Sequence, residues 1–180
     1  PLIPENSFGM ESALYNAVAC TQGVSVTSLL SKSPLATVFV NGLLQDTEPL
    51  DKEINVVFKK GFHAIKIKAG GNVEEDIKRI KKIIEVIPRW IKVHIDVNQQ
   101  WGFEDALFFA DAIDRARIEY IEEPFKDISR IPEFFQKTSI AVALDESIFL
   151  SGLKKACSLE GVKVWVLKPT PLGGIRRALS

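Results

Sequence analysis

The sequence predicts an α/β fold: a (β/α) barrel of the TIM type, incomplete, with about six β/α units. Two observations indicate this fold. Short segments rich in β-branched residues alternate with longer segments of helical periodicity, which is typical of parallel βαβ units. A polar residue also closes each expected strand, at regular steps of 23 to 28 residues along the chain. Because a doubly wound sheet reverses direction midway, this uniform unit favours a barrel.

The N-terminal part of the chain is expected to be helical. Apolar residues at helical spacing predict a helix over residues 7–20, and Gly23 marks its end. The chain begins with Pro1 rather than Met, so we expect it to be a segment of a longer polypeptide.

Six strands, with helices between them, are expected in the rest of the chain. The strands are residues 37–41, 64–68, 93–97, 118–122, 140–145 and 162–167. The helices are residues 50–60, 73–87, 103–116, 131–137 and 149–159, and one that starts near residue 175. The second of these helices has clear boundary signals, since Asn72 and Glu75 fit a capping box and Pro88 ends it.

The strand at residues 64–68 carries two lysines on one face. Side chains alternate between faces in a strand, so Lys66 and Lys68 point one way while Ile65 and Ile67 point the other. Two like charges on one face indicate an anionic group opposite them. The alternative is a solvent-exposed edge strand whose lysines guard against aggregation.

The polar residues that close the strands would meet at one mouth of a barrel. In chain order they are Asn41, Lys68, Asp96, Glu122, Asp145 and Lys168. Three carboxylates repel one another unless a cation lies between them. Oxygen ligands without His or Cys suit Mg²⁺, or Mn²⁺ as the alternative. The sequence therefore predicts a divalent metal site, although each acid taken singly could be a helix cap or a solvated loop residue.

Lysines on either side of the carboxylates suggest the chemistry. A divalent ion with an amine on each side suits removal of a proton next to a carboxylate, followed by stabilisation of the enediolate. A lysine acts as the base once neighbouring positive charge and burial lower the pKa of its amine, and Lys66 and Lys68 would each make protonation of the other harder. Glu123 and Glu146 adjoin two of the acids and are expected to support the site or face solvent.

Composition excludes several classes of protein. Lys+Arg and Asp+Glu both number 23, so no net charge favours nucleic acid or an anionic membrane. No apolar stretch is long enough to span a bilayer, and no signal peptide is visible. Cys20 and Cys157 lie far apart and favour a reducing compartment, and His63 and His94 lack ligand spacing. We expect a cytosolic protein, or a plastid one if the source is photosynthetic and a transit peptide has been removed.

Five segments, in this order, resemble the enolase superfamily and its muconate-lactonizing-type subgroup. They are Lys66–Lys68, Asp96–Trp101, Ile121–Pro124, Leu144–Ser147 and Lys168–Gly174. Within the subgroup the last segment, together with Gly9–Ala13, is most similar to o-succinylbenzoate synthases, lyases of menaquinone and phylloquinone biosynthesis. The resemblance implies that residues 1–36 are the helical tail of an N-terminal capping domain and that residues 37–180 are the partial catalytic barrel.

The resemblance also implies a role for each site residue. Asp96, Glu122 and Asp145 would bind Mg²⁺. Lys68 would be the base, Lys168 would stabilise the enediolate from the other face, and Lys66 would orient or tune Lys68. Asn98 and Glu146 would contact the metal-binding residues without binding the metal themselves. The reaction implied is syn dehydration of a cyclohexadiene carboxylate to o-succinylbenzoate.

Other functions use the same residues. Dipeptide epimerases and N-succinylamino acid racemases would employ Lys68 and Lys168 as two bases, and the two lysines alone do not separate racemisation from dehydration. A third alternative is an inactive fragment that serves assembly or regulation. The expected partners are a small-molecule carboxylate and the remainder of the barrel and cap, with no nucleic acid and no membrane.

Overall fold

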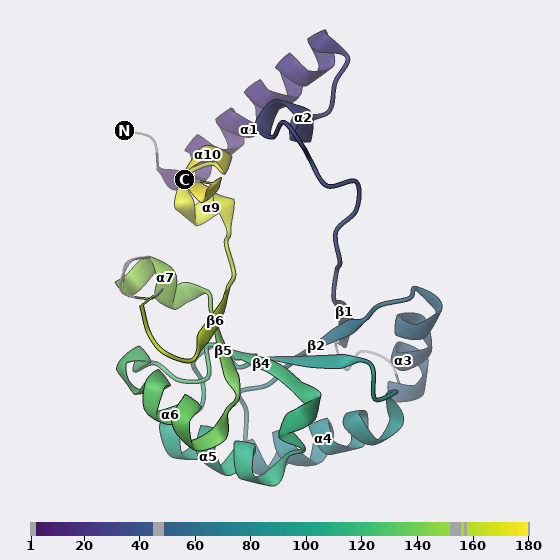
Figure 1. The fold of residues 1–180 in the computed structure, drawn as a ribbon, viewed down its shortest axis with the longest axis vertical. Coiled ribbons are helices and arrows are strands. Elements are labelled where there is room, and N and C mark those ends of the chain that lie inside the picture. Colours follow the sequence, from purple (N-terminus) through teal and green to yellow (C-terminus); the bar gives the residue numbers. More distant parts are fainter. Residues whose placement is uncertain (1–2, 45–48, 152–155, 157, 180) are drawn as a thin grey trace. The chain divides into compact units, whose positions relative to one another are not determined.

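The computed structural model describes residues 3–44, 49–151, 156 and 158–179. The chain forms two compact units, one of Pro1–Val38 with Leu167–Ser180 and the other of Phe39–Val166 (Figure 1). The predicted boundary between a capping tail at 1–36 and a barrel at 37–180 stays a prediction.

The larger unit is built on a six-stranded sheet whose neighbours follow the order of the sequence. All pairs of neighbouring strands are parallel, as predicted. The strands are β1 (Gly42–Leu44), β2 (Ala64–Lys68), β3 (Lys92–Asp96), β4 (Ile118–Glu122), β5 (Ala141–Leu144) and β6 (Val162–Trp165). Sequential order with parallel pairing brings the carboxyl ends of these strands to one edge of the sheet.

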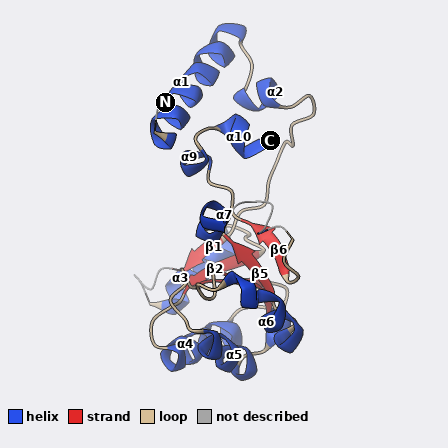
Figure 2. Cartoon of the chain, turned by 90° about the vertical axis from the view of Figure 1, so that its left-hand side faces the viewer, coloured by secondary structure: helices blue, strands red, loops and turns tan. Residues whose placement is uncertain are grey.

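Helices connect the strands. They are α3 (Leu50–Lys59), α4 (Val73–Val86), α5 (Phe103–Ala112), α6 (Ile131–Thr138) and α7 (Glu146–Ser151), with short 3₁₀ turns η1 (Arg115–Arg117) and η2 (Ile128–Arg130). α4, α5 and α6 lie along one face of the sheet (Figure 2). The helix predicted over 149–159 falls partly outside the described residues. The one predicted over 103–116 ends earlier, at Ala112.

The core lies between the sheet and these helices. Ile65 and Ile67 of β2 are fully buried, as the alternation of that strand predicts. Ile80 of α4, Phe109 of α5 and Phe134 of α6 are also fully buried and belong to the same apolar cluster. α4 begins as expected, since Asn72 Oδ1 accepts a hydrogen bond from the Glu75 amide at 3.1 Å. The core therefore fixes which face of each strand points away from the helices.

The first predicted strand is wrong in position. The structure places β1 at Gly42–Leu44 rather than at residues 37–41, and Phe39 is 91% exposed. Pairing with β2 starts at Gly42, where a side chain would meet Val57 and Phe62 at 3.0 Å. The apolar residues before Gly42 resemble a buried strand in composition but gain no such burial. Asn41 therefore precedes the strand that it was expected to close.

The smaller unit consists of short helices around one long helix. They are α1 (Pro4–Gln22), α2 (Val26–Leu30), α9 (Pro169–Leu172) and α10 (Ile175–Leu179). α2 and α9 were not predicted. Glu11 of α1 accepts hydrogen bonds from the backbone amides of Ile175 and Arg176 at the start of α10. A side chain at Gly174 would collide with the Glu11 carboxylate, so this glycine allows the contact. Among the described helices, none has the length and apolarity needed to cross a membrane.

Candidate active site

Three predicted site residues meet on the neighbouring strands β2, β3 and β4. Lys66 Nζ lies 2.9 Å from Asp96 Oδ2 and 2.6 Å from Glu122 Oε2. The carboxylates are almost fully buried, and the Lys66 side chain is 24% exposed. The anionic partner that the two lysines of β2 indicated is therefore present, and it is contacted by Lys66.

The charges of this group are incompletely balanced. Burial, the strongest influence, lowers the pKa of Lys66, but hydrogen bonds and charge from Glu122 and Asp96 outweigh it and the pKa is raised. Burial raises the pKa of Glu122, and the charges of Asp96 and Asp145 raise it further against the hydrogen bond from Lys66. One ammonium group thus faces more negative charge than it neutralises. Lys66 is held as a cation, which differs from the expectation that Lys66 and Lys68 each disfavour protonation of the other.

Lys68 ends β2 with an exposed side chain. Its backbone carbonyl accepts a hydrogen bond from the Arg79 guanidinium, and it lies in register with Asp96 of β3. Lys68 is thus placed beside the acidic cluster by its strand, although Lys66 makes the ion pairs. Lys168 precedes α9 in the smaller unit, so its position opposite Lys68 stays a prediction.

The carboxylate oxygens of Asp96, Glu122 and Asp145 are ligands of the kind that a hard cation such as Mg²⁺ prefers. Asp145 follows β5, is 2% exposed and contributes negative charge at Glu122. Asp96 Oδ1 is buried and has no hydrogen-bond partner among the described residues. In the described ranges, however, no three His, Cys, Asp or Glu side chains stand close enough together to hold a metal ion. Since Lys66 lies between Asp96 and Glu122, a metal bound by both would require its ammonium group to move aside.

A layer of aromatic side chains lies next to the carboxylates. The ring of His94, two residues before Asp96, stacks on Tyr120 with centroids 4.0 Å apart. Burial lowers the pKa of His94 and raises that of Tyr120, and Asn41 hydrogen-bonds to the Tyr120 hydroxyl. Asn41 therefore contacts this aromatic layer rather than the carboxylates that it was predicted to join.

The loops after the strands carry a polar network that the sequence revealed only in part. Asn98 Nδ2 donates to Glu146 Oε1 at 3.3 Å, so the two predicted supporting residues contact each other. Glu123 is fully buried and accepts hydrogen bonds from the β3 and β5 loops. Glu123 directly follows β4, and its φ of 45° lies outside the range of a strand. A second acid beside Glu122 was the only sequence signal for this residue.

A second network fixes the backbone after Lys68. Asp76 Oδ2 accepts hydrogen bonds from the Gly70 amide at 2.9 Å and from Trp101 Nε1 at 3.2 Å. Gly70 has a φ of 114°, and a side chain there would lie 2.6 Å from the Val97 carbonyl. The turn at Gly70 therefore requires glycine, because its backbone comes close to the Val97 carbonyl directly after β3.

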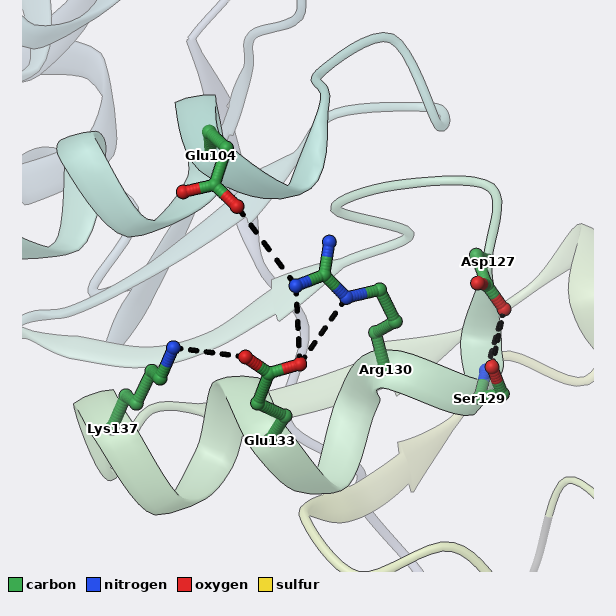
Figure 3. Close-up of polar contacts among 6 residues, drawn as sticks. All are labelled: Glu104, Asp127, Ser129, Arg130, Glu133 and Lys137. Carbon is green, nitrogen blue, oxygen red and sulfur yellow. Dashed lines mark hydrogen bonds and ion pairs between the residues drawn. The ribbon is translucent and has the colours of Figure 1, made fainter.

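Charged residues on α6 form a network of their own. Glu133 pairs with Lys137 at 2.8 Å and with Arg130 at 3.1 Å, and Arg130 also lies 3.8 Å from Glu104 (Figure 3). Hydrogen bonds from Lys137 and Arg130 lower the pKa of the exposed Glu133. Their mutual pairing indicates a stabilised helix surface rather than a reactive site.

Comparison with known proteins identifies the family. Residues 50–180 match the family model described as enolase C-terminal domain-like. The chain belongs to this family. This agrees with the resemblance of its five segments to the enolase superfamily.

Curated relatives match most of the chain. It is 30% identical to Arabidopsis thaliana "Protein PHYLLO, chloroplastic" over 98% of the chain and 11% of that protein. It is also 30% identical to o-succinylbenzoate synthase of Thermobifida fusca, over 79% of the chain and 46% of that protein. The chain thus spans less than half the length of these two curated relatives.

Solved structures support the barrel. A dipeptide epimerase from Enterococcus faecalis V583, complexed with Mg and the dipeptide L-Leu-L-Tyr, superimposes with a TM-score of 0.80 at 26% identity. The match covers 99% of this chain and 51% of that one. Muconate lactonizing enzyme from Pseudomonas putida gives a TM-score of 0.82 at 26% identity, over 96% of this chain and 50% of that enzyme. With six parallel strands in sequence order, the fold is an incomplete (β/α) barrel of the TIM type, as predicted.

Proposed function

We propose that this chain carries the proton-abstracting site of an o-succinylbenzoate synthase-like lyase. The observation that carries the proposal is the meeting of Lys66, Asp96 and Glu122 at the strand ends, with Lys68 in register beside them. Barrel enzymes place their catalytic groups at these ends. The similarity to the o-succinylbenzoate synthase of Thermobifida fusca supports the choice of reaction.

Asp96, Glu122 and Asp145 would hold Mg²⁺, or Mn²⁺ in its place, through carboxylate oxygens. When bound, the ion supplies positive charge that offsets the second negative charge of an enediolate. This chain's own residues would do the rest. Lys66, moved aside from Asp96 and Glu122 when the ion binds, would present positive charge to the carboxylate of the substrate.

Lys68 would take the proton next to the substrate carboxylate, and the electron pair of that C–H bond would form the enediolate. Lys168 would stabilise the enediolate from the opposite face by hydrogen bonding. Collapse of the enediolate then expels hydroxide from the neighbouring carbon. The proton carried by Lys68 would join that hydroxide, so that water leaves and the ring becomes aromatic.

Exchange of the substrate's α-proton in D₂O tests this reaction class. Mg²⁺-dependent loss of the α-proton NMR signal is expected with the wild-type chain and not with Lys68→Ala. Lys92→Ala is the matched control, because Lys92 is an exposed lysine at the opposite end of the neighbouring strand. Equal exchange by the wild-type and Lys68→Ala chains would contradict the assignment of the base.

A dipeptide epimerase or N-succinylamino acid racemase is the second candidate, since the superimposed Mg-bound structure is a dipeptide epimerase. That reaction requires Lys168 to deliver a proton from the opposite face. Lys168→Arg should therefore abolish epimerisation of a dipeptide and leave some dehydration. Comparison of both substrates with this variant separates the two functions.

The third candidate is an inactive fragment that needs the remainder of a barrel and cap as its partner. A folded chain that binds no Mg²⁺ in calorimetry favours this candidate, whereas turnover by the monomer rejects it. For the location, the cytosol is the first expectation, and similarity to PHYLLO, a protein named as chloroplastic, supports the plastid as the alternative.

A further inference from the structure

Glu123 is a buried acid that the reaction above does not use. Its side chain is completely inaccessible to solvent, and its carboxylate accepts hydrogen bonds from four donors. They are the backbone amides of Asp145 at 2.7 Å and Ser147 at 2.8 Å, Ser147 Oγ at 2.6 Å and Gln99 Nε2 at 2.9 Å. A buried carboxylate is tolerated only when such donors replace its lost hydration.

These donors follow the two strands that flank β4. Gln99 follows β3, and Asp145 and Ser147 follow β5, while Glu123 itself follows β4. Its main chain joins them too, because its carbonyl accepts the Gln99 amide at 2.7 Å and its amide donates to Ala143 at 3.0 Å. One residue therefore ties together the carboxyl ends of three neighbouring strands.

The backbone at this junction is strained. Asn98, Gln99 and Glu123 have φ values of 48°, 61° and 45°, a left-handed region that side chains disfavour. Such conformations persist where surrounding contacts impose them, and they cluster at functional sites. Here the hydrogen bonds of Glu123 constrain the backbone at Gln99 and at Glu123 itself.

We propose that Glu123 is a positioning residue that holds the strand ends carrying Asp96, Glu122 and Asp145 next to one another. Asp96 lies three residues before Gln99, which donates a hydrogen bond to Glu123. Glu122 is the residue next to Glu123. Glu123 accepts a hydrogen bond from the Asp145 backbone amide, so it positions the backbone that carries the Asp145 carboxylate. This inference rests on the proposed function, which makes the three acids metal ligands. Its geometry comes from the hydrogen bonds of Glu123.

Substitution of Glu123 in the full 180-residue chain tests the proposal. Glu123→Ala removes all four side-chain hydrogen bonds, whereas Glu123→Gln keeps an oxygen for the two backbone amides and nearly the same shape. Ile83→Ala is the matched control. Ile83 is fully buried in α4, so this substitution removes core packing but leaves the strand ends unchanged. Mn²⁺ affinity, measured by electron paramagnetic resonance, and amide hydrogen exchange at Asp145 and Ser147 are the two measurements.

In Glu123→Ala we expect Mn²⁺ affinity to fall at least tenfold and the two amides to exchange faster than the other sheet amides do. Glu123→Gln should remain near wild type in both measurements, and Ile83→Ala should lose thermal stability without losing affinity. Unchanged Mn²⁺ affinity in a folded Glu123→Ala chain would overturn the proposal.

Failure of the wild-type chain to bind Mn²⁺ would count against the proposed function instead. Amide exchange then decides the positioning inference by itself. Selective acceleration at Asp145 and Ser147 in Glu123→Ala, and not in Ile83→Ala, would support it. Equal acceleration in the two variants would overturn it.

Discussion

Replacing Lys66 by methionine removes the ammonium group that joins Asp96 to Glu122 and keeps an unbranched side chain of similar length. Loss of one partner from a buried ion pair costs about 3–5 kcal/mol. The Lys66 side chain is 24% exposed, and Glu122 can relieve the repulsion by binding a proton. We therefore expect the free energy of unfolding to fall by about 2–3 kcal/mol at pH 8, measured by urea denaturation.

The pH dependence of this loss has a definite sign. The raised pKa of Lys66 means that its stabilisation is fully present below its unfolded value of 10.5 and is lost as the pH rises through the folded value. The raised pKa of Glu122 means that ionising it in the folded state costs stability above its unfolded value of 4.5. Without Lys66 that cost grows. The difference between wild type and Lys66→Met should thus be larger at pH 8 than at pH 4.5.

Lys92→Met is the control for this experiment, since it removes an exposed lysine from the neighbouring strand. We expect it to change the free energy of unfolding by less than about 0.5 kcal/mol. Equal losses in Lys66→Met and Lys92→Met, or a loss that grows as the pH falls, would refute the description of Lys66 as the counter-ion of the buried acids.

Two further substitutions test the backbone beside Lys68. Gly70→Ala places a methyl group 2.6 Å from the Val97 carbonyl at a φ of 114°, so we expect about 2–3 kcal/mol of destabilisation in urea denaturation. A loss below about 0.5 kcal/mol would contradict this close approach. Trp101→Phe removes the hydrogen bond to Asp76 and should cost about 1–3 kcal/mol, with faster amide exchange at Gly70. Unchanged exchange at Gly70 would show that Trp101 does not help to hold this network.

Strand alternation predicted much of the barrel interior. In β2 it placed Lys66 on one face and Ile65 and Ile67 on the other, and the structure confirms this arrangement. Local patterns suffice here because a strand has a period of two and one face must be buried. The spacing of polar residues also predicted the strands that carry Asp96 and Glu122.

Features that depend on distant contacts were less predictable. The exposed segment before Gly42 has the composition of a strand, and only pairing with β2 shows where β1 begins. The choice of Lys66 over Lys68 as the partner of the acids depends on the register between three strands. The role of Glu123 depends on hydrogen bonds to Gln99, Asp145 and Ser147, which are distant in sequence, and no sequence period reveals such contacts.

The most direct test of the account is a calorimetric titration of the full chain with Mg²⁺. Asp96→Asn, Glu122→Gln and Asp145→Asn remove one carboxylate charge each with little change of shape. The account predicts one bound ion per wild-type chain and at least tenfold weaker binding in each variant. Wild-type affinity in all three variants, or a folded wild-type chain that binds no ion, would contradict it.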